Sequence, residues 1–377
     1  MILFGEGYFF FVLVIACLPA VVLGLTERSI KWYGLAASVF IVCLALGTWQ
    51  GMLRLAGYCL FEYILIKCWT LYCARKPHDG KAYAVVLLLS LTPLIVWKVS
   101  SAAGTTLFAC IGLSYMTFKC AQMVIETYDG LIENVSPSDF VYLLIFFPCI
   151  SSGPIDRSRR FLSDLAPIPR AEYIDLLGDG IYRIIKGLLY KFAFASAFYQ
   201  GMIWLGAGTS IRERLICMYM YGLYLFFDFA GYSLMAVGAS YIFGIRTPDN
   251  FNKPFASTDI KDFWDRWHMT LSYWFRDYLF SRFMMRSIRG KWFKNKLTGA
   301  SIGFMLDMLV MGLWHGLELH FIAYGLYHGL LLAGTEIYQK KSGFHKKHKK
   351  DGWYIAAGRI VTIQLVFIGF YIFSGRF

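Results

Sequence analysis

Apolar residues in this chain come in long continuous runs rather than in the two-residue alternation of strands. The segments Trp32–Leu53, Val99–Phe118 and Phe192–Ile211 each extend for about the length of a membrane span without a charged residue. A transmembrane β-barrel needs alternating apolar and polar positions, so these runs exclude one. The pattern predicts an all-α polytopic membrane protein.

The same pattern predicts where the membrane segments lie. We expect spans at about Tyr8–Leu25, Trp32–Trp49, Met52–Tyr72, Ala82–Val99, Thr105–Ile125, Tyr182–Leu205, Leu215–Phe243, Leu306–Leu319 and Ile355–Phe373. Span length and the remaining apolar segments suggest about ten to twelve membrane segments. No internal repeat and no break in hydropathy is visible, so we expect one membrane domain over residues 1–377.

Two stretches do not read as ordinary spans. Phe140–Ser152 is too short to cross comfortably and runs into Ser-Ser-Gly-Pro, which predicts a broken or re-entrant helix. Such backbone is tolerated at membrane depth only where protein buries it or water reaches it. Asp259–Phe280 has helical periodicity but is dense in charge and tryptophan, which predicts an amphipathic or partly embedded helix. Glu62, inside the third span, needs an interior partner.

Composition supports the membrane assignment and limits the partners. Hydrophobic residues make up 58% of the chain and charged residues 16%, whereas soluble proteins carry about 25% charged residues. The net charge of +13 gathers in segments between spans, such as Arg282–Lys296 and Lys340–Lys350, as the positive-inside rule describes. This placement argues against nucleic acid as a partner and puts both segments at the cytoplasmic surface.

His315 is the main candidate for chemistry. It lies in the centre of the apolar stretch Leu306–Leu319, and an ionisable residue at membrane depth is a functional candidate by default. Gly312 and Gly316 flank Trp314 and His315, and residues without a Cβ allow a backbone or a thin substrate to approach closely. The alternative is a histidine that only hydrogen-bonds between helices.

Other histidines and one acid are weaker candidates. His268 is either a second catalytic group or a hydrogen-bonding residue of a polar helix. His320 and His328 lie nearer to the expected span ends, where an interfacial role is more common. Asp228 is expected to be paired with Arg266 or Arg276, because a buried unpaired carboxylate is costly.

Several common chemistries find no support in the sequence. There is no His-Glu-x-x-His, no Cys-x-x-Cys, no Gly-x-Ser-x-Gly, no phosphate loop and no dinucleotide fingerprint. The cysteines are scattered singly, so neither a zinc site nor a disulfide framework is indicated. Histidine-assisted group transfer within the bilayer is the chemistry that remains.

Four ordered motifs carry a resemblance to a known family. They are Asp228-Phe-Ala-Gly-Tyr-Ser233, Asn250-Phe-Asn-Lys-Pro-Phe255, the run Asp262–Asp277 around Trp264-Asp-Arg-Trp-His268, and Gly312-Leu-Trp-His315-Gly316. Together they resemble the membrane-bound O-acyltransferases. The elements Ser152–Arg157 and Phe373–Gly375 are similar to the members of that family that transfer D-alanine in Gram-positive bacteria. Asp265 departs from the Asn expected in the Trp-x-Arg-Trp-His element.

The resemblance implies a fold and a reaction. The expected fold is a ring of membrane helices with re-entrant segments around a central tunnel, in the cell membrane. His315 matches the family's catalytic histidine and His268 its second functional histidine. The implied donor is D-alanine held as a thioester on the phosphopantetheine arm of a cytoplasmic carrier protein, with no metal and no permanently bound cofactor. The implied destination is lipoteichoic acid on the outer face, or an intermediate acceptor, together with a membrane-anchored extracellular partner.

Further residues are expected around this centre. The substrate or tunnel residues are expected to be Trp314, Gly312, Gly316, Trp267, Asp228 and Ser152. A basic rim with apolar residues inside it would dock an acidic carrier, at Arg282, Phe283, Met284, Met285, Arg286 and Arg289.

Three alternatives stay open. Alginate O-acetyltransferases share several of the motifs, although they are usually longer, so O-acetylation of an exported polysaccharide is a second possible reaction. A scaffold that docks the carrier without catalysis is another. A transporter would predict paired broken helices in two related halves, and the sequence shows no such symmetry.

Overall fold

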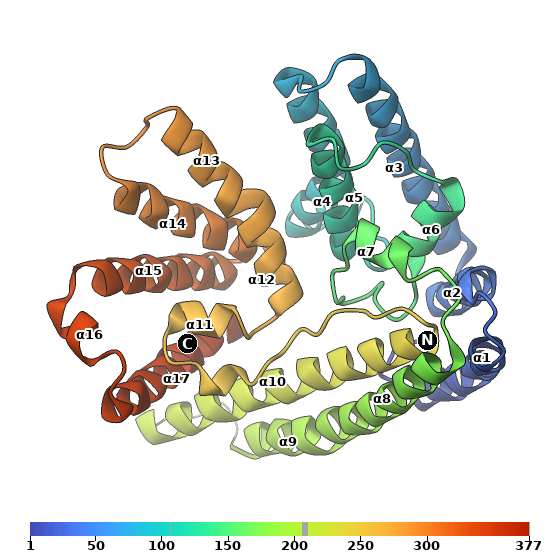
Figure 1. Ribbon diagram of the computed structural model, residues 1–377. Helices are drawn as coiled ribbons and strands as arrows, with labels where there is room; N and C mark the ends of the chain where they lie inside the picture. Colours follow the sequence, from blue (N-terminus) through green and yellow to red (C-terminus); the bar gives the residue numbers. More distant parts are fainter. Residues whose placement is uncertain (106, 206–209, 377) are drawn as a thin grey trace. The chain divides into compact units, whose positions relative to one another are not determined.

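The computed structural model describes residues 1–105, 107–205 and 210–376, without the side chain of Leu205. Over this part of the chain the secondary structure is helical, apart from one isolated antiparallel bridge between Phe251 and Trp267 (Figure 1). Five described helices are long and apolar enough to cross a membrane: Gly7–Leu25, Gly80–Ala102, Ile211–Ile242, Lys296–His315 and Gly352–Ser374. The predicted all-α polytopic membrane protein is confirmed, while the number of ten to twelve membrane segments stays a prediction.

The chain divides into two compact units. Unit 1 comprises Met1–Leu188 and Gly231–Pro248, and unit 2 comprises Leu189–Ala230 and Asp249–Phe377. The expectation of a single domain over residues 1–377 stays a prediction. Each unit has its own buried core and is described by itself.

Unit 1 is built around α5 (Leu113–Tyr128), a helix that is almost completely buried. Its helices are α1 (Gly7–Leu25), α2 (Lys31–Leu46), α3 (Trp49–Arg75), α4 (Gly80–Ala102), α5 (Leu113–Tyr128), α6 (Pro137–Ile145), α7 (Ser158–Ser163) and α8 (Arg170–Leu188), with the last part of α10 (Ile211–Ile242). The helices α3 and α4 both pack on α5, as Figure 1 shows in blue and teal. The predicted fifth span began at Thr105, whereas α5 begins at Leu113, directly after Gly112 with φ +70°.

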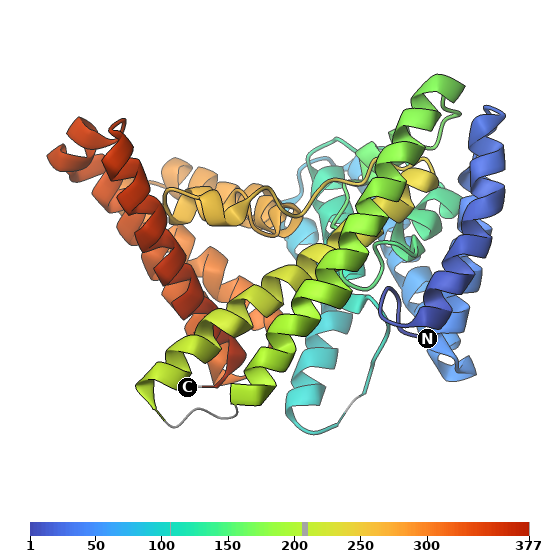
Figure 2. The ribbon, with the colours of Figure 1, turned by 90° about the horizontal axis from the view of Figure 1, so that it is seen from below.

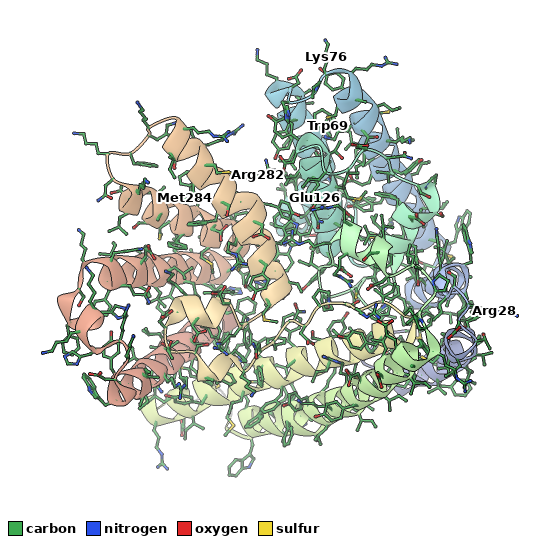
Figure 3. All side chains as sticks on the ribbon, viewed as in Figure 1. Arg28, Trp69, Lys76, Glu126, Arg282 and Met284 are labelled. Atoms are coloured by element: carbon green, nitrogen blue, oxygen red, sulfur yellow. The ribbon has the colours of Figure 1, made fainter. Side chains whose placement is uncertain are left out.

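Several buried polar side chains of unit 1 form hydrogen bonds between its helices. Ser90 Oγ donates a hydrogen bond of 2.9 Å to the fully buried Glu62, which confirms the interior partner expected for that carboxylate. Lys119 Nζ donates to the backbone oxygen of Leu143 at 2.8 Å. Trp69, labelled in Figure 3, donates its indole N–H to the backbone oxygen of Val124 at 3.0 Å. These bonds tie α3, α4, α5 and α6 together across an apolar interior, where unpaired polar groups are costly.

The short helix before the Ser-Ser-Gly-Pro sequence is confirmed. The helix α6 ends at Ile145, and the chain continues without regular helix until α7 begins at Ser158. Tyr232 holds this segment, since its hydroxyl lies 2.9 Å from Ser151 Oγ and accepts the backbone N–H of Ser152 at 3.2 Å. The irregular backbone is therefore largely buried by protein, as the membrane environment requires.

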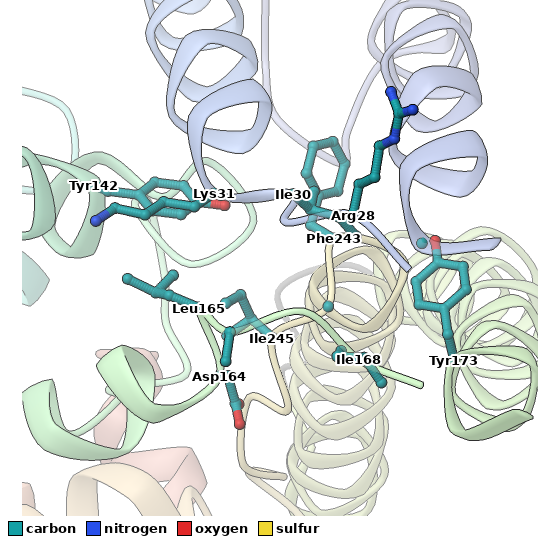
Figure 4. A pocket seen from close by; sticks show the side chains of 13 residues that line it. Arg28, Ile30, Lys31, Tyr142, Asp164, Leu165, Ile168, Tyr173, Phe243 and Ile245 are labelled. Atoms are coloured by element: carbon teal, nitrogen blue, oxygen red, sulfur yellow. The ribbon is translucent and has the colours of Figure 1, made fainter. Parts of the chain in front are cut away.

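Unit 1 contains a pocket that is too small to hold a substrate. It lies where loops meet Tyr142, Asp164 and Tyr173, and its volume is about 10 Å³, which is room for about one water molecule (Figure 4). Tyr173 donates to the backbone oxygen of Ile242 at 2.8 Å, and Asp164 accepts the backbone N–H of Arg246 at 2.7 Å. These contacts are structural and fasten α8 and the loop before α8 to the end of α10.

Unit 2 contains the histidines of interest. Its elements are the π-helix η1 (Leu189–Ala195), α9 (Ser196–Leu205), the first part of α10, the 3-10 turn η2 (Pro254–Ala256), α11 (Ile260–Trp264), α12 (Met269–Phe275), the π-helix η3 (Arg276–Phe280), α13 (Ser281–Arg289), α14 (Lys296–His315), α15 (Leu319–Lys341), α16 (Gly343–His348) and α17 (Gly352–Ser374). Helix α14 packs along α15, and α15 also packs on α17 (Figures 1 and 2).

Helices α8 and α10 approach through glycines within unit 1. A Cβ built on Gly180 would lie 2.8 Å from the backbone oxygen of Gly238 and 3.2 Å from the Tyr241 side chain. A Cβ on Gly238 would in turn lie 2.8 Å from the side chain of Ile184. Real Cβ atoms do not approach backbone so closely, so these glycines set the distance between the two helices.

We expect Gly180→Leu to lower the melting temperature of the purified protein, because overpacking of a close contact costs about 1–3 kcal/mol. Gly178→Leu is the matched control, since it makes the same change in α8 where a Cβ would have nothing within 4 Å. Thermal unfolding in detergent measures both variants. Equal melting temperatures for the two variants would contradict the close glycine contact.

Candidate active site

His268 lies at a sharp break between two short helices. The helices α11 and α12 are separated at residues 265–268, and His268 has φ +44° and ψ +49°. The prediction of one continuous helix over Asp259–Phe280 is therefore wrong. The neighbouring backbone pairs antiparallel with a distant segment, because Met269 N donates to Asn250 O at 2.9 Å and Asn252 N donates to Arg266 O at 3.0 Å. A left-handed backbone with a side chain persists only where surrounding contacts fix it, and this pairing supplies them.

The imidazole of His268 is buried and uncharged at neutral pH. It is 4% exposed, and its ring stands perpendicular to that of Phe229 at 4.7 Å. The pKa of His268 is lowered to about 3, chiefly by burial and in smaller part by the charge of His315. Its Nε2 atom has no hydrogen-bond partner within the described residues. A neutral imidazole with a free nitrogen can serve as one hydrogen-bond donor or acceptor for a substrate.

His315 lies at the end of a helix rather than in its centre. The helix α14 ends at His315, Gly316 is extended, and α15 begins at Leu319. The expectation of a continuous helix over Leu306–Leu319 is therefore wrong, because the chain turns back at Gly316. A Cβ on Gly316 would collide with the side chains of Glu318 and Phe321, so a larger residue here would have to displace both side chains. His315 is partly exposed, which leaves its imidazole within reach of another molecule.

Aromatic rings surround His315 on several sides. The ring centroids of Trp314, Phe373, Phe321 and Tyr324 lie 4.6, 5.0, 6.1 and 6.2 Å from that of His315. Phe373 comes from α17, so the terminal Phe-Ser-Gly element belongs to the same site. Both histidines that the sequence singled out belong to unit 2. Their joint role in one site stays a prediction.

Gly312 serves the packing of two helices. A Cβ on Gly312 would meet the backbone oxygen of Phe321 and would lie 3.2 Å from Gly325 Cα, and a Cβ on Gly325 would lie 3.3 Å from Gly312 Cα. The sequence offered two reasons for this glycine, the close approach of a backbone or of a thin substrate. The structure shows the close approach of a backbone. A role for Gly312 and Gly316 in a substrate tunnel stays a prediction.

Trp267 is a core residue next to His268. It is 5% exposed, and its ring lies 4.7 Å from Phe370, 5.0 Å from Phe251 and 5.6 Å from Phe263. This packing fixes the backbone next to the break at His268. A direct contact of Trp267 or Trp314 with substrate stays a prediction.

Asp228 is paired, but with a different residue than expected. Its carboxylate forms an ion pair with Lys191 of η1. Arg266 instead bonds to Asp262 at 2.6 Å, and Arg276 bonds to Asp265 at 3.0 Å. The expected pairing with either arginine is wrong, because acids nearer in the chain already occupy both guanidinium groups. Asp265 therefore has a structural role as the ionic partner of Arg276. The Asn expected at this position would be a neutral partner.

Ser152 belongs to unit 1, whereas both histidines belong to unit 2. The backbone N–H of Ser152 is held by Tyr232, as described above. A role for Ser152 in a tunnel stays a prediction.

A cavity of about 450 Å³ lies inside unit 2, beside α14. Met284 of α13 lines it, and so does Met311, which lies one helical turn before His315. Its wall is largely apolar. The polar side chains in it include Ser272, the carboxylate of Asp307 and the pairs Lys261–Glu336 and Arg276–Asp265. A cavity with an apolar wall and a few polar groups is typical of a site for a small molecule or a cofactor arm.

The expected carrier-docking residues lie together on α13 and at its beginning. Met285 and Ile288 are each 50% exposed, and Arg286 and Arg289 are exposed beside them. Phe283 packs toward the following turn, with its ring 5.9 Å from Trp292, and Met284 faces the cavity. Figure 3 labels Arg282 and Met284 on either side of this helix. The exposed surface of α13 is therefore basic with an apolar centre.

His328 is a buried residue that the sequence analysis misplaced. It lies in the middle of α15, is fully buried, and packs against Tyr324 at 4.7 Å and Trp264 at 5.2 Å between ring centroids. Neither ring nitrogen has a hydrogen-bond partner within the described residues. The expected interfacial position near a span end is wrong. The flanking Gly325 and Gly329 were the available signal, since such spacing marks a helix that packs closely.

The donor set gives no indication of a metal centre. Within residues 1–105, 107–205 and 210–376, no group of three or more His, Cys, Asp or Glu side chains could hold a metal ion.

Comparisons with known proteins agree with this geometry. Residues 65–374 match the model of the membrane-bound O-acyltransferase family. The chain is 40% identical to the teichoic acid D-alanyltransferase of Bacillus subtilis over 99% of its length and 98% of that protein. It is 36% identical to the teichoic acid D-alanyltransferase of Streptococcus thermophilus, over 99% of this chain and 94% of that protein. A probable alginate O-acetylase of Pseudomonas aeruginosa is 31% identical over 59% of this chain and 42% of that protein. The chain therefore belongs to the membrane-bound O-acyltransferase family and is an acyltransferase of the cell membrane.

Proposed function

We propose that this chain moves D-alanyl groups from a carrier-protein thioester toward teichoic acid, with His315 as the general base. The observations that carry the proposal are a partly exposed His315 at a helix end among aromatic rings, and a buried, neutral His268 whose Nε2 has no partner within the described residues, both in unit 2. The near full-length similarity to two teichoic acid D-alanyltransferases supports the choice of D-alanine over acetate. The alginate relatives match only part of this chain.

The transfer balances as a direct exchange of a thioester for an ester. His315 takes the proton of the acceptor hydroxyl as its oxygen attacks the thioester carbonyl. The tetrahedral intermediate then collapses, the carbon–sulfur bond breaks, and the leaving thiolate takes the proton from the imidazolium. The carbonyl end of α14 carries partial negative charge, so it stabilises the imidazolium that forms in between.

His268 is proposed to stabilise the oxyanion. Its burial keeps the ring neutral at working pH, so it would act by donating a hydrogen bond rather than by carrying charge. The rigid backbone pairing around residues 250–252 and 266–269 holds the ring in place, which a preorganised donor requires. In this proposal both imidazoles act at one carbonyl group, His315 on the acceptor hydroxyl and His268 on the oxyanion.

The cavity beside α14 is the proposed passage for the phosphopantetheine arm. Its lining extends from Met284 of α13 to Met311, and His315 follows one turn further, about 6 Å along the helix. A long, thin and flexible arm suits such an apolar passage. The residues present fit the arm, which would supply the thioester itself, and no permanently bound group is needed for this exchange.

The exposed surface of α13 is the proposed docking surface for the carrier. Arg286 and Arg289 would attract an acidic partner, while Met285 and Ile288 would supply adaptable apolar contact. A membrane-anchored extracellular partner and lipoteichoic acid, directly or through an intermediate acceptor, would receive the alanine. The tunnel across the membrane and these partners rest on the resemblance to the family.

We expect His315→Ala to lower acyl transfer by at least about 100-fold, because a positioned general base contributes about 10²–10⁴-fold. Purified protein supplied with D-alanyl-carrier and a membrane acceptor measures the rate of thioester loss. His320→Ala is the matched control, since His320 is the next histidine in the chain and its ring packs on Phe321.

Two results would reject this assignment. Normal transfer by a folded His315→Ala protein would exclude His315 as the base. Acyl transfer that requires a second protein and ignores His315 would favour a scaffold that only docks the carrier.

We expect charge reversal of Arg286 and Arg289 to glutamate to weaken carrier binding, with a smaller difference at high salt because exposed charges are screened. Surface plasmon resonance or co-purification with the carrier measures the affinity. The double reversal of Lys346 and Lys347, in the other basic segment, is the control with equal charge change. Equal weakening by both double variants would mean that net charge, not α13, attracts the carrier.

A further inference from the structure

A second cavity of unit 2, of about 570 Å³, has no part in the proposed reaction. It lies among α15, α16, α17 and the chain just before α11, and it shares no lining residue with the cavity beside α14. It is larger than the cavity beside α14, and Lys349 and His345 lie at one end of it. Its walls define the chemistry of what it could hold.

One end of this cavity is polar and cationic. Lys349 and His345 line it, and His345 Nδ1 lies 3.0 Å from the Tyr354 hydroxyl, which lies 3.2 Å from that of Tyr338. The surrounding segment Lys340–Lys350 contains six lysines and no acid. Clusters of four to eight basic residues next to a membrane span attract anionic lipid headgroups.

The other end is an apolar face of a membrane-spanning helix. Ile355, Gly358, Val361 and Leu365 of α17 line the cavity at helical spacing, with Ala357 beside them. The eleven residues from Ile355 to Leu365 extend about 15 Å. This length equals one leaflet of the bilayer's hydrocarbon core, which is about 30 Å thick in total.

Two aromatic side chains mark the level of the lipid headgroups. Phe344 and Trp353 flank the basic end and are 54% and 56% exposed. Tryptophan and other amphipathic rings gather at the boundary between headgroups and acyl chains. The basic end is thereby placed at headgroup depth and the α17 face within the leaflet below it.

Asp259 is the acidic residue in the wall of this cavity, and its negative charge repels an anion only weakly. Asp259 Oδ1 accepts the backbone N–H groups of Lys261 at 2.8 Å and Asp262 at 3.0 Å, and Oδ2 accepts from Gln339 at 2.9 Å. Its carboxylate caps α11 at the positive end of the helix dipole, which compensates its charge. Asp351, the acid nearest the basic segment, bonds to His348 at 2.7 Å.

We infer that this cavity binds one anionic diacyl phospholipid, with its phosphate at Lys349 and His345 and an acyl chain along α17. A zwitterionic lipid would make the same chain contacts but would gain less from the lysines. Binding would brace α15 and α17 against the start of α11, the segment that leads to His268. The inference does not depend on the acyl donor or acceptor.

Lipid retention by the purified full-length protein tests the headgroup contact. Native mass spectrometry compares retained phosphatidylglycerol with phosphatidylcholine of the same acyl chains. We expect preference for phosphatidylglycerol, and we expect Lys349→Ala to weaken its binding about fivefold, the effect of one lysine near an anionic surface. Lys350→Ala is the matched control, because Lys350 is exposed in the same segment but does not line the cavity.

A second pair of variants tests the acyl-chain groove. We expect Ala357→Leu to displace the lipid by filling the groove, while Ala356→Leu retains it, because Ala356 is outside the cavity lining. Both alanines are exposed on α17, so melting temperature without added lipid checks the fold. No preference for the anionic lipid, equal loss in the two lysine variants, or full retention by Ala357→Leu would each overturn the inference and leave only general attraction to the membrane surface.

Discussion

The position of His315 depends on how closely two helices approach. Where Gly312 of α14 faces Gly325 of α15, backbone meets backbone, and no side chain larger than hydrogen fits between them. The contact lies one turn before α14 ends at His315, so it fixes the end of that helix in space. In lipid the hydrophobic effect does not draw helices together, and close van der Waals packing of small residues takes its place.

The surroundings of His315 follow from that contact. Because α15 turns back immediately after Gly316, Phe321 and Tyr324 come to lie beside the imidazole, and α17 adds Phe373. The surroundings of His315 are therefore aromatic. His268 belongs to the same unit, on a backbone held by pairing with Asn250 and Asn252.

Unit 2 has two basic regions with different physical character. On α13, the exposed Arg286 and Arg289 lie beside the exposed Met285 and Ile288, which combines positive charge with an apolar surface. At α16, Lys349 and His345 stand over a deep groove along α17, which suits a molecule with a charged head and a thin apolar tail. The positive-inside rule accounts for basic residues in both places, but it does not account for the apolar face beneath each of them.

The sequence by itself determined the membrane class, the family motifs and the two histidines. These features are local: span-length apolar runs and ordered motifs can be read without knowing which segments touch. The partner of Asp228, the burial of His328 and the contact that Gly312 makes were decided by tertiary structure, because each depends on residues from another helix. The same holds for the break at His268, where helical periodicity predicted one helix and pairing with Asn250 stabilised a turn instead. Hydrophobic periodicity records how a segment meets its surroundings on average, whereas a single hydrogen bond or close contact is set by the geometry of the folded chain.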